Sequence, residues 1–218
     1  MRPHVRTFAE EVAAARPDGP VVEIGARPAA GQEALADLRA LFPGVDYIGC
    51  DIQDGPNVDR VEDVHHLSFA DDSVGAVLAF DTLEHVADPI RALEEIHRVL
   101  RPGGVVAITS VMFFVIHAHP WDYWRFTPEG FGLLLRPFEQ HRVLSLGWSE
   151  LPETVFGLGV KGRSPSIDEV SLARTEALCA AWGRGRQVDL GPMRMTLGEL
   201  WRLTLRESLA GVRRRMAR

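Results

Sequence analysis

The sequence predicts an α/β fold built on a doubly wound, mostly parallel sheet. Short apolar runs of strand length alternate with segments of helical periodicity, and glycine, proline and aspartate separate them. This alternation is typical of a parallel sheet whose two faces are covered by helices. The predicted strands occupy residues 21–24, 45–50, 74–80, 105–109, 141–146 and 154–161.

The predicted helices carry their own start and stop signals. Asp88 is a natural N-cap with Pro89 at the first helical position, and residues 102–104, Pro-Gly-Gly, end that helix. Thr127 and Pro128 give the same start signal for a helix over 127–135. Two further helices are predicted over 7–15 and 32–41.

The character of the chain changes beyond Gly162. A Ser-Pro-Ser linker at 164–166 precedes a predicted helix over 168–182, and a last helix carries an apolar stripe from Leu197 to Met216. That stripe includes Trp201 and cannot bury itself alone. We therefore expect a domain over 1–162 and a helical segment over 163–218 that acts as a lid or forms a homodimer interface.

Composition narrows the possible partners and the compartment. The 218 residues include 46% hydrophobic and 25% charged ones, as in ordinary soluble domains. The net charge of −6 disfavours a nucleic-acid partner, and no run of about 18 apolar residues predicts a membrane span. Cys50 and Cys179 form no metal-binding or disulfide pattern, and the N-terminus has no apolar signal region, so we expect a reducing, cytoplasmic location.

Acidic residues and a glycine stand where doubly wound sheets bind nucleotides. Glu23 and Gly25 end the first strand, and Asp51 ends the second. Ligands bind outside the carboxyl ends of such strands, where glycine lets the backbone approach them closely. Asp51 can accept hydrogen bonds from both ribose hydroxyls of an adenosine, a placement that serves NAD equally well.

Five blocks in order resemble the class I S-adenosylmethionine (SAM)-dependent methyltransferases of the type 11 sort. The resemblance covers about residues 19–162 and implies a Rossmann-like, seven-stranded sheet, with SAM as cofactor and S-adenosylhomocysteine (SAH) as product. The blocks are Glu23–Gly25, Tyr47–Asp51, Asp63–Ser73, Leu83–Pro89 and Glu95–Gly104.

The resemblance also implies which residues contact SAM. Glu23, Gly25 and Ala26 would line its methionine end, Asp51 its ribose, and Ile52, Asp63 and Val64 its adenine; the backbone of Phe80 would lie near the sulfonium or amino group. Where the family usually has two further glycines, this chain has Arg27 and Ala29 with Pro28 between them. We therefore expect a stiffer loop, for which Gly31 partly compensates.

The stretch 116–127 follows the strand 105–109 and should rise beside the transferable methyl group. Its aromatic, basic and acidic side chains suit an acceptor pocket, and a nearby histidine can remove a hydroxyl proton. The catalytic candidates are His117, His119 and Asp122, with His85 added by the resemblance; the substrate-binding candidates are Trp121, Tyr123, Trp124 and Arg125. Aromatic core packing and a structural Asp122–Arg125 ion pair are open alternatives. A divalent metal on His117, His119 and a carboxylate is a further alternative, which the ligand spacing alone does not favour.

These residues predict an O-methyltransferase acting on a small-molecule hydroxyl, with a sugar or oligosaccharide as the expected acceptor. Aromatic platforms beside His, Asp and Arg suit polyol recognition, and the stretch resembles methyltransferases of polysaccharide and glycoside tailoring, such as the mycobacterial sugar 1-O-methyltransferases of methylmannose polysaccharide synthesis. The alternatives are an N- or C-methyltransferase, a non-catalytic SAM-binding subunit and, if SAM does not bind, a nicotinamide oxidoreductase.

Overall fold

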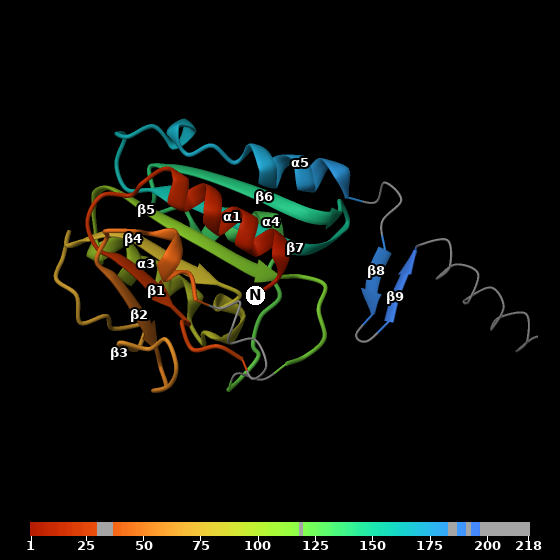
Figure 1. Cartoon of the computed structure of the whole chain (residues 1–218), viewed down its shortest axis with the longest axis horizontal. Coiled ribbons are helices and arrows are strands. Elements are labelled where there is room, and N and C mark those ends of the chain that lie inside the picture. Colours follow the sequence, from red (N-terminus) through yellow and green to blue (C-terminus); the bar gives the residue numbers. More distant parts are fainter. Residues whose placement is uncertain (30–36, 118–119, 183–186, 191–192, 197–218) are drawn as a thin grey trace, which may run out of the picture. The chain divides into compact units, whose positions relative to one another are not determined.

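The computed structural model describes residues 1–29, 37–117, 120–182, 187–190 and 193–196. The chain divides into two compact units, Met1–Ala180 and Ala181–Arg218 (Figure 1). The first unit contains a seven-stranded sheet. In the second, β8 (Gln187–Leu190) pairs antiparallel with β9 (Met193–Thr196), a pairing that the sequence did not indicate.

The strands of the large sheet lie in the order β3-β2-β1-β4-β5-β7-β6. Neighbours among β1 to β5 run parallel, and β7 runs antiparallel to both β5 and β6. This confirms the predicted doubly wound, mostly parallel sheet and places the switch in strand order between β1 and β4. The strands are β1 (Val21–Ile24), β2 (Tyr47–Asp51), β3 (Arg60–Val61), β4 (Val74–Phe80), β5 (Leu100–Val111), β6 (Gln140–Trp148) and β7 (Leu151–Val160).

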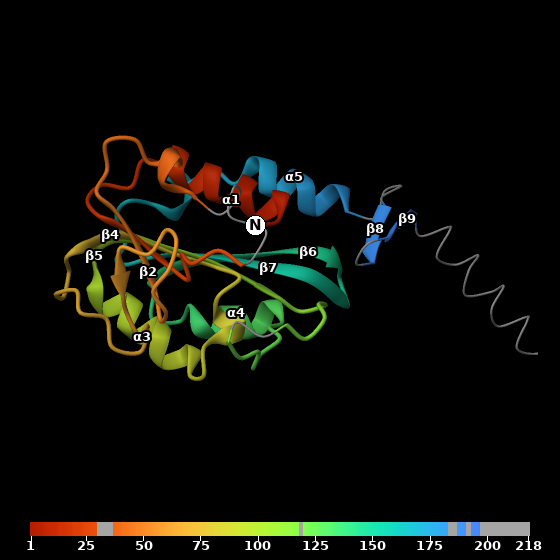
Figure 2. The same ribbon diagram turned by 60° about the horizontal axis from the view of Figure 1, so that its bottom comes forward.

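Helices cover both faces of this sheet. Figure 2 shows α1 and α5 on one face, and α3 and α4 on the other. The burial of every residue of β4 fits this two-sided cover, because a strand between two helical layers has no solvent-facing side. The bounds are α1 (Pro3–Ala14), α3 (Pro89–Val99), α4 (Pro128–Leu134) and α5 (Ala173–Ala181), with single 3-10 turns η1 (Arg39–Leu41), η2 (Leu83–His85) and η3 (Ile167–Glu169).

The predicted helix starts hold in the structure. The Asp88 side chain accepts a hydrogen bond from the Arg91 N–H, and the Thr127 side chain accepts one from Gly130. From its cap, α3 buries an apolar stripe against the sheet: Ala92, Leu93, Ile96 and Val99. Each cap satisfies one of the donors that a helix leaves unpaired at its start, which fixes where the chain turns after β4 and β5.

Residues after Gly162 continue the first unit as far as Ala180. The buried carboxylate of Glu11 in α1 explains this: it accepts hydrogen bonds from the Arg174 N–H at 2.7 Å and from the Thr175 hydroxyl at 2.6 Å. Residues 163–180 thus pack on the sheet domain, and a division after Gly162 stays only a prediction. The expected helix over 168–182 is split into η3 and α5.

Two predicted helices lie wholly or partly outside the described residues. Of the segment 32–41, only residues 37–41 are described, and 39–41 form η1. The apolar stripe from Leu197 to Met216 lies outside the described part. Within the described residues, no helix is both long and apolar enough to cross a membrane.

Candidate functional site

A sharp turn at the end of β1 opens the site. Gly25 has φ of +79°, and a Cβ atom on it would lie 2.4 Å from the Thr82 hydroxyl oxygen. That hydroxyl is within 3.1 Å of the Ile24 and Phe80 carbonyls, so it ties the ends of β1 and β4 together. Only glycine fits here, because both the backbone angle and the available space exclude a side chain.

A cavity of about 600 Å³ lies at the carboxyl ends of the parallel strands, next to this turn. Every residue expected to contact SAM lines it: Glu23, Gly25, Ala26, Asp51, Ile52, Asp63, Val64 and Phe80. On the side of β4 and β5, the same cavity is lined by His85, His117, Trp121 and Tyr123. The fold therefore brings the predicted cofactor residues and half of the predicted acceptor residues into one space.

The acidic residues on the cofactor side are held in fixed positions. Glu23 is buried and accepts a hydrogen bond from the Tyr47 hydroxyl at 2.6 Å; its burial raises the pKa of its carboxyl to about 7. Asp51 accepts backbone N–H groups from Gln53 at 3.0 Å and from Arg27 at 3.3 Å. Both carboxylates are thus oriented before any ligand arrives.

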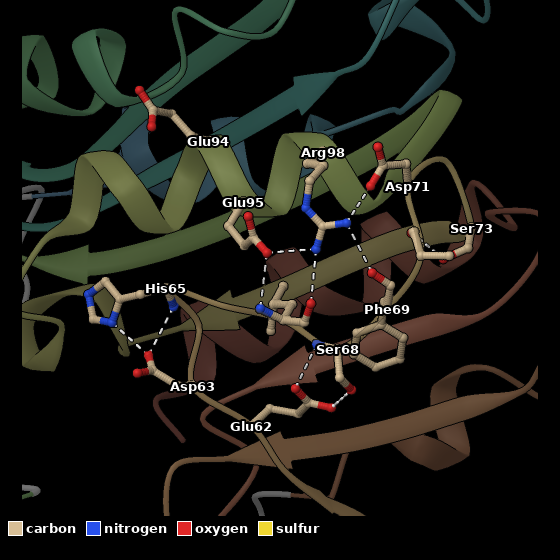
Figure 3. A network of polar contacts seen from close by, with 12 residues as sticks. Glu62, Asp63, His65, Ser68, Phe69, Asp71, Ser73, Glu94, Glu95 and Arg98 are labelled. Carbon is tan, nitrogen blue, oxygen red and sulfur yellow. Dashed lines mark hydrogen bonds and ion pairs between the residues drawn. The ribbon is translucent and has the colours of Figure 1, made fainter.

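Asp63 is oriented by its neighbour His65. One carboxylate oxygen of Asp63 accepts the His65 backbone N–H at 2.9 Å and lies 2.6 Å from the ring Nδ1 (Figure 3). Burial alone would raise the pKa of Asp63, but these hydrogen bonds outweigh it and lower the pKa. Asp63 is therefore an ionised acceptor at neutral pH, as recognition of an exocyclic amine requires.

The loop behind Asp63 is fastened to α3 by Arg98. The Arg98 guanidinium donates to the carbonyls of Leu67 at 2.9 Å and Phe69 at 3.1 Å, and pairs with Glu95 at 2.6 Å (Figure 3). Glu95 in turn accepts the Leu67 N–H at 3.1 Å. A rigid helix therefore sets the position of the loop that carries Asp63 and Val64.

Arg27, which stands where the family usually has a glycine, makes local contacts on the cofactor side. Its guanidinium donates to the Gln53 side chain at 2.8 Å, and its backbone N–H points at Asp51. Arg27, Pro28 and Ala29 all line the cavity. The loop is thus tied to the end of β2 by its own side chain, and Gly31 lies outside the described residues.

On the acceptor side, the segment after β5 is fastened to η2. The Tyr123 and Trp124 N–H groups donate to the Glu84 carbonyl at 2.7 and 3.2 Å, and the Trp124 indole N–H donates to the Val86 carbonyl at 2.8 Å. These bonds place His85 against the segment, where its Nδ1 lies 2.5 Å from the Trp121 carbonyl. Two stretches far apart in sequence are thereby joined at the wall of the cavity.

Both described histidine candidates have their Nδ1 atoms against acceptors. His85 Nδ1 faces the Trp121 carbonyl, and His117 Nδ1 lies 3.1 Å from the Val115 carbonyl and 3.3 Å from an Asp122 carboxylate oxygen. A carbonyl only accepts, so the hydrogen-bond pattern assigns the proton of each neutral ring to Nδ1 and the lone pair to Nε2. The two rings meet edge to face with centroids 4.9 Å apart. His119 lies outside the described residues.

Asp122 and Arg125 form an ion pair that shapes the segment. The two contacts between them measure 2.5 and 2.8 Å, and Arg125 also donates to the Val115 carbonyl at 3.0 Å. The hydrogen bonds from Arg125 hold the pKa of the Asp122 carboxyl far below its usual range. Asp122 also accepts the His117 N–H at 2.7 Å, so we interpret it as a positioning residue for His117.

The predicted aromatic residues divide into two groups. Trp121 and Tyr123 line the cavity with exposed, stacked rings 6.3 Å apart, whereas Phe126 is buried in the core. Trp124 and Arg125 are not among the described residues that line the cavity. Trp124 binds the Val86 carbonyl and Arg125 binds Asp122, so both residues help to shape the segment, and their expected substrate contacts stay a prediction.

The structure places three charged or acidic residues in the cavity wall that the sequence did not single out: Asp81, Glu84 and Arg2. Asp81, with φ of +51°, pairs with Arg2 at 2.7 Å; burial would raise the pKa of Asp81, but Arg2 holds it below its ordinary value. Glu84 is fully buried, and burial, followed by the charge of Asp81, raises the pKa of its carboxyl to about 8. Ser110 donates to Glu84 at 2.6 Å. The only sequence signal for Asp81 and Glu84 was that they follow the end of β4, and this position does not show how far their side chains are buried.

Comparison with known proteins identifies the kind of domain. Residues 22–108 match the family model described as a methyltransferase domain. This stretch runs from β1 into β5 and includes Gly25, Asp51, Asp63 and His85. The match confirms a methyltransferase domain over this stretch, as the resemblance predicted.

Relatives and solved structures agree with this match. A probable S-adenosylmethionine-dependent methyltransferase of Mycolicibacterium smegmatis is 33% identical over 95 residues, 41% of this chain and 37% of that protein. The SAM complex of phosphoethanolamine N-methyltransferase 2 from Haemonchus contortus is 16% identical, covers 73% of this chain and 57% of that one, and has a TM-score of 0.51. The 4+2 cyclase SpnF is 15% identical, covers 72% and 81%, and has a TM-score of 0.53.

These similarities define the fold and the domain. The alignments span 29%, 37% and 38% of the length of three curated relatives, so this chain matches about a third of each. The structural neighbours, at 15% and 16% identity, share the Rossmann-like methyltransferase fold.

Proposed function

We propose that this chain is a SAM-dependent methyltransferase that methylates a hydroxyl group of a small-molecule acceptor, with a sugar or oligosaccharide as the acceptor class. The observation that carries the proposal is the single cavity that joins Asp51 and Asp63 to His85 and His117. A cavity of about 600 Å³ is within the usual range for small-molecule sites, so one space can bring donor and acceptor together.

The transfer requires one bond to form as another breaks. The acceptor oxygen attacks the methyl carbon of SAM in line with the carbon–sulfur bond, SAH leaves as a neutral thioether, and the hydroxyl proton passes to a base. His85 or His117 supplies this base through Nε2, since Nδ1 of each ring faces a carbonyl. Alignment of the reactants provides much of the acceleration, and a positioned base adds about 10²–10⁴-fold.

The exposed aromatic rings favour a saccharide over a compact aliphatic acceptor. Trp121 is 59% exposed and Tyr123 is 48% exposed, and their rings stack at an interplanar angle of 30°. Aromatic faces left open at a cavity wall can cover the apolar face of a sugar ring. Polar groups at the same wall can then bind its hydroxyls.

Titration calorimetry and a methyl-transfer screen test this proposal. We expect SAM and SAH to bind with one site per chain, and mass spectrometry to detect a gain of one methyl group on at least one sugar or glycoside. Tyr123→Ala should raise KM for that acceptor without changing SAH affinity. A chain that binds neither SAM nor SAH would overturn the proposal.

A second candidate is a SAM-binding subunit without methyl-transfer activity. It is favoured by Arg27 in place of a glycine in the loop after β1. This candidate predicts that SAH binds but that no acceptor class, whether oxygen, nitrogen or carbon, gains a methyl group in the same screen. Transfer to nitrogen or carbon alone would retain the methyltransferase and reject the hydroxyl acceptor.

A further inference from the structure

We propose that Glu84, His85 and His117 form a binding site for one divalent transition-metal cation in the wall of the cavity. Each residue offers an oxygen or nitrogen ligand atom, and these atoms lie within 4.8 Å of one another. The site differs from the metal alternative raised from the sequence, which used His119 and was not favoured. Binding of the cation stands on this geometry, and only its catalytic role rests on the proposed function.

Glu84 provides the first reason for a cation here. Its side chain is fully buried, and Ser110 donates to Oε2 at 2.6 Å. Its other oxygen, Oε1, is buried and accepts no hydrogen bond from the residues that the structure describes. A buried carboxylate oxygen without a donor is costly, and a coordinated cation would satisfy it.

The charges around Glu84 point the same way. Asp81 is neutralised by Arg2 at 2.7 Å, and Asp122 by Arg125 at 2.5 Å. Within the described part of the chain, Glu84 forms no ion pair of its own. The two neighbouring ion pairs therefore supply no partner for the unsatisfied Glu84 oxygen, and a cation placed against that oxygen would supply one.

The two histidines have the surroundings typical of metal ligands. Histidine that binds a metal through one ring nitrogen usually donates its other N–H to a carbonyl or carboxylate, which fixes the tautomer and the ring orientation. His85 makes such a contact with the Trp121 carbonyl, and His117 with the Val115 carbonyl and Asp122. Both rings therefore have, on Nδ1, the acceptor contacts that metal-binding histidines usually show.

The ligand set selects the kind of metal. Two imidazoles and one carboxylate suit Zn²⁺, Mn²⁺ or Fe²⁺, whereas Mg²⁺ and Ca²⁺ prefer oxygen ligands alone. Three protein ligands leave coordination positions open to a water molecule or to an acceptor oxygen in the cavity. With a cation bound, the two histidines would serve as ligands in place of the base of the metal-free reaction, and an acceptor hydroxyl bound to the cation would lose its proton to solvent through the cavity.

Metal titration of the whole chain, after treatment with a chelator and dialysis, tests the site directly. We expect one equivalent of Zn²⁺ to bind at least 100-fold more tightly than Mg²⁺, and Co²⁺ to give the visible absorption of a site with nitrogen ligands. Glu84→Gln, which can keep the Ser110 bond, and His117→Ala should each weaken Zn²⁺ binding at least tenfold. His141→Ala, an exposed histidine on β6, is the matched control and should change nothing.

Circular dichroism and SAH titration of each variant separate the outcomes. Equal Zn²⁺ affinity in the parent chain, in folded Glu84→Gln and in folded His117→Ala overturns the metal site. If SAH binds and Zn²⁺ does not, the metal site is wrong and the proposed function stands. If Zn²⁺ binds at these residues and neither SAM nor SAH does, the metal site stands and the proposed function is wrong.

Discussion

Gly25→Ala should destabilise the fold and weaken cofactor binding together. The new methyl group would lie 2.4 Å from the Thr82 hydroxyl oxygen and 2.9 Å from its Cγ2. The φ of +79° costs a residue with a Cβ about 1–2 kcal/mol. Displacing Thr82 from its bonds to Ile24 and Phe80 costs about 1 kcal/mol more for each bond lost. We therefore expect the free energy of unfolding to fall by about 2–4 kcal/mol.

A double-mutant cycle with Thr82→Ala isolates the steric part of this cost. Thr82→Ala removes both atoms that come closest to the new methyl group, at the expense of its own hydrogen bonds. The two substitutions together should therefore cost less than the sum of the separate costs, by about 1 kcal/mol or more. Urea unfolding of the four proteins gives the free energies, and calorimetry gives SAH affinity. Additive costs would show that Gly25 is not confined by Thr82, contrary to this reasoning.

Three further changes probe the cavity wall. Asp51→Asn should weaken SAH binding about tenfold with little effect on unfolding, as expected for loss of a hydrogen bond between a charged group and a ligand; an unchanged affinity in calorimetry would remove Asp51 from the ribose site. Burial raises the pKa of Glu23 from its ordinary 4.5 to about 7, so its neutral form stabilises the fold below about pH 4.5 and that stabilisation is lost as the pH rises through 7. Urea unfolding of Glu23→Gln should therefore show a smaller fall in stability between pH 5 and 8 than the parent chain, and parallel profiles would contradict the raised pKa. Trp124→Phe should lower the free energy of unfolding by about 1 kcal/mol by removing the bond to Val86, whereas Trp121→Ala should raise KM for the acceptor and leave stability nearly unchanged; the reverse pattern would exchange their roles.

The sheet could be predicted from the sequence because its signals are local. Apolar runs, caps such as Asp88 and turn glycines such as Gly25 act within a few residues of where they stand. The cofactor side followed from the same logic, because the ends of parallel strands meet at one edge. Asp51 therefore had to lie near Gly25 once the strands were placed, whereas Asp63 was assigned by the resemblance to the methyltransferases.

The acceptor side could be predicted only in outline, because distant contacts decide which side chains face the cavity. Trp121 and Trp124 lie in the same polar and aromatic stretch. Of the two, Trp124 is held by a hydrogen bond from its indole N–H to the carbonyl of Val86, which lies 38 residues earlier. In the sequence, Glu84 is an ordinary acid beside a histidine. The structure shows that it is buried and accepts a hydrogen bond from Ser110, which lies 26 residues later in the chain. Neither of these two contacts can be predicted from the spacing of residues in the sequence.

A crystal structure with SAH bound tests the account most directly. We predict that the ribose hydroxyls contact Asp51, that the adenine lies against Ile52 and Val64 with its amine near Asp63, and that the sulfur faces the wall formed by His85, His117, Trp121 and Tyr123. SAH bound elsewhere, or bound with its sulfur turned away from this wall, would contradict the claim that one cavity holds both the methyl donor and its acceptor.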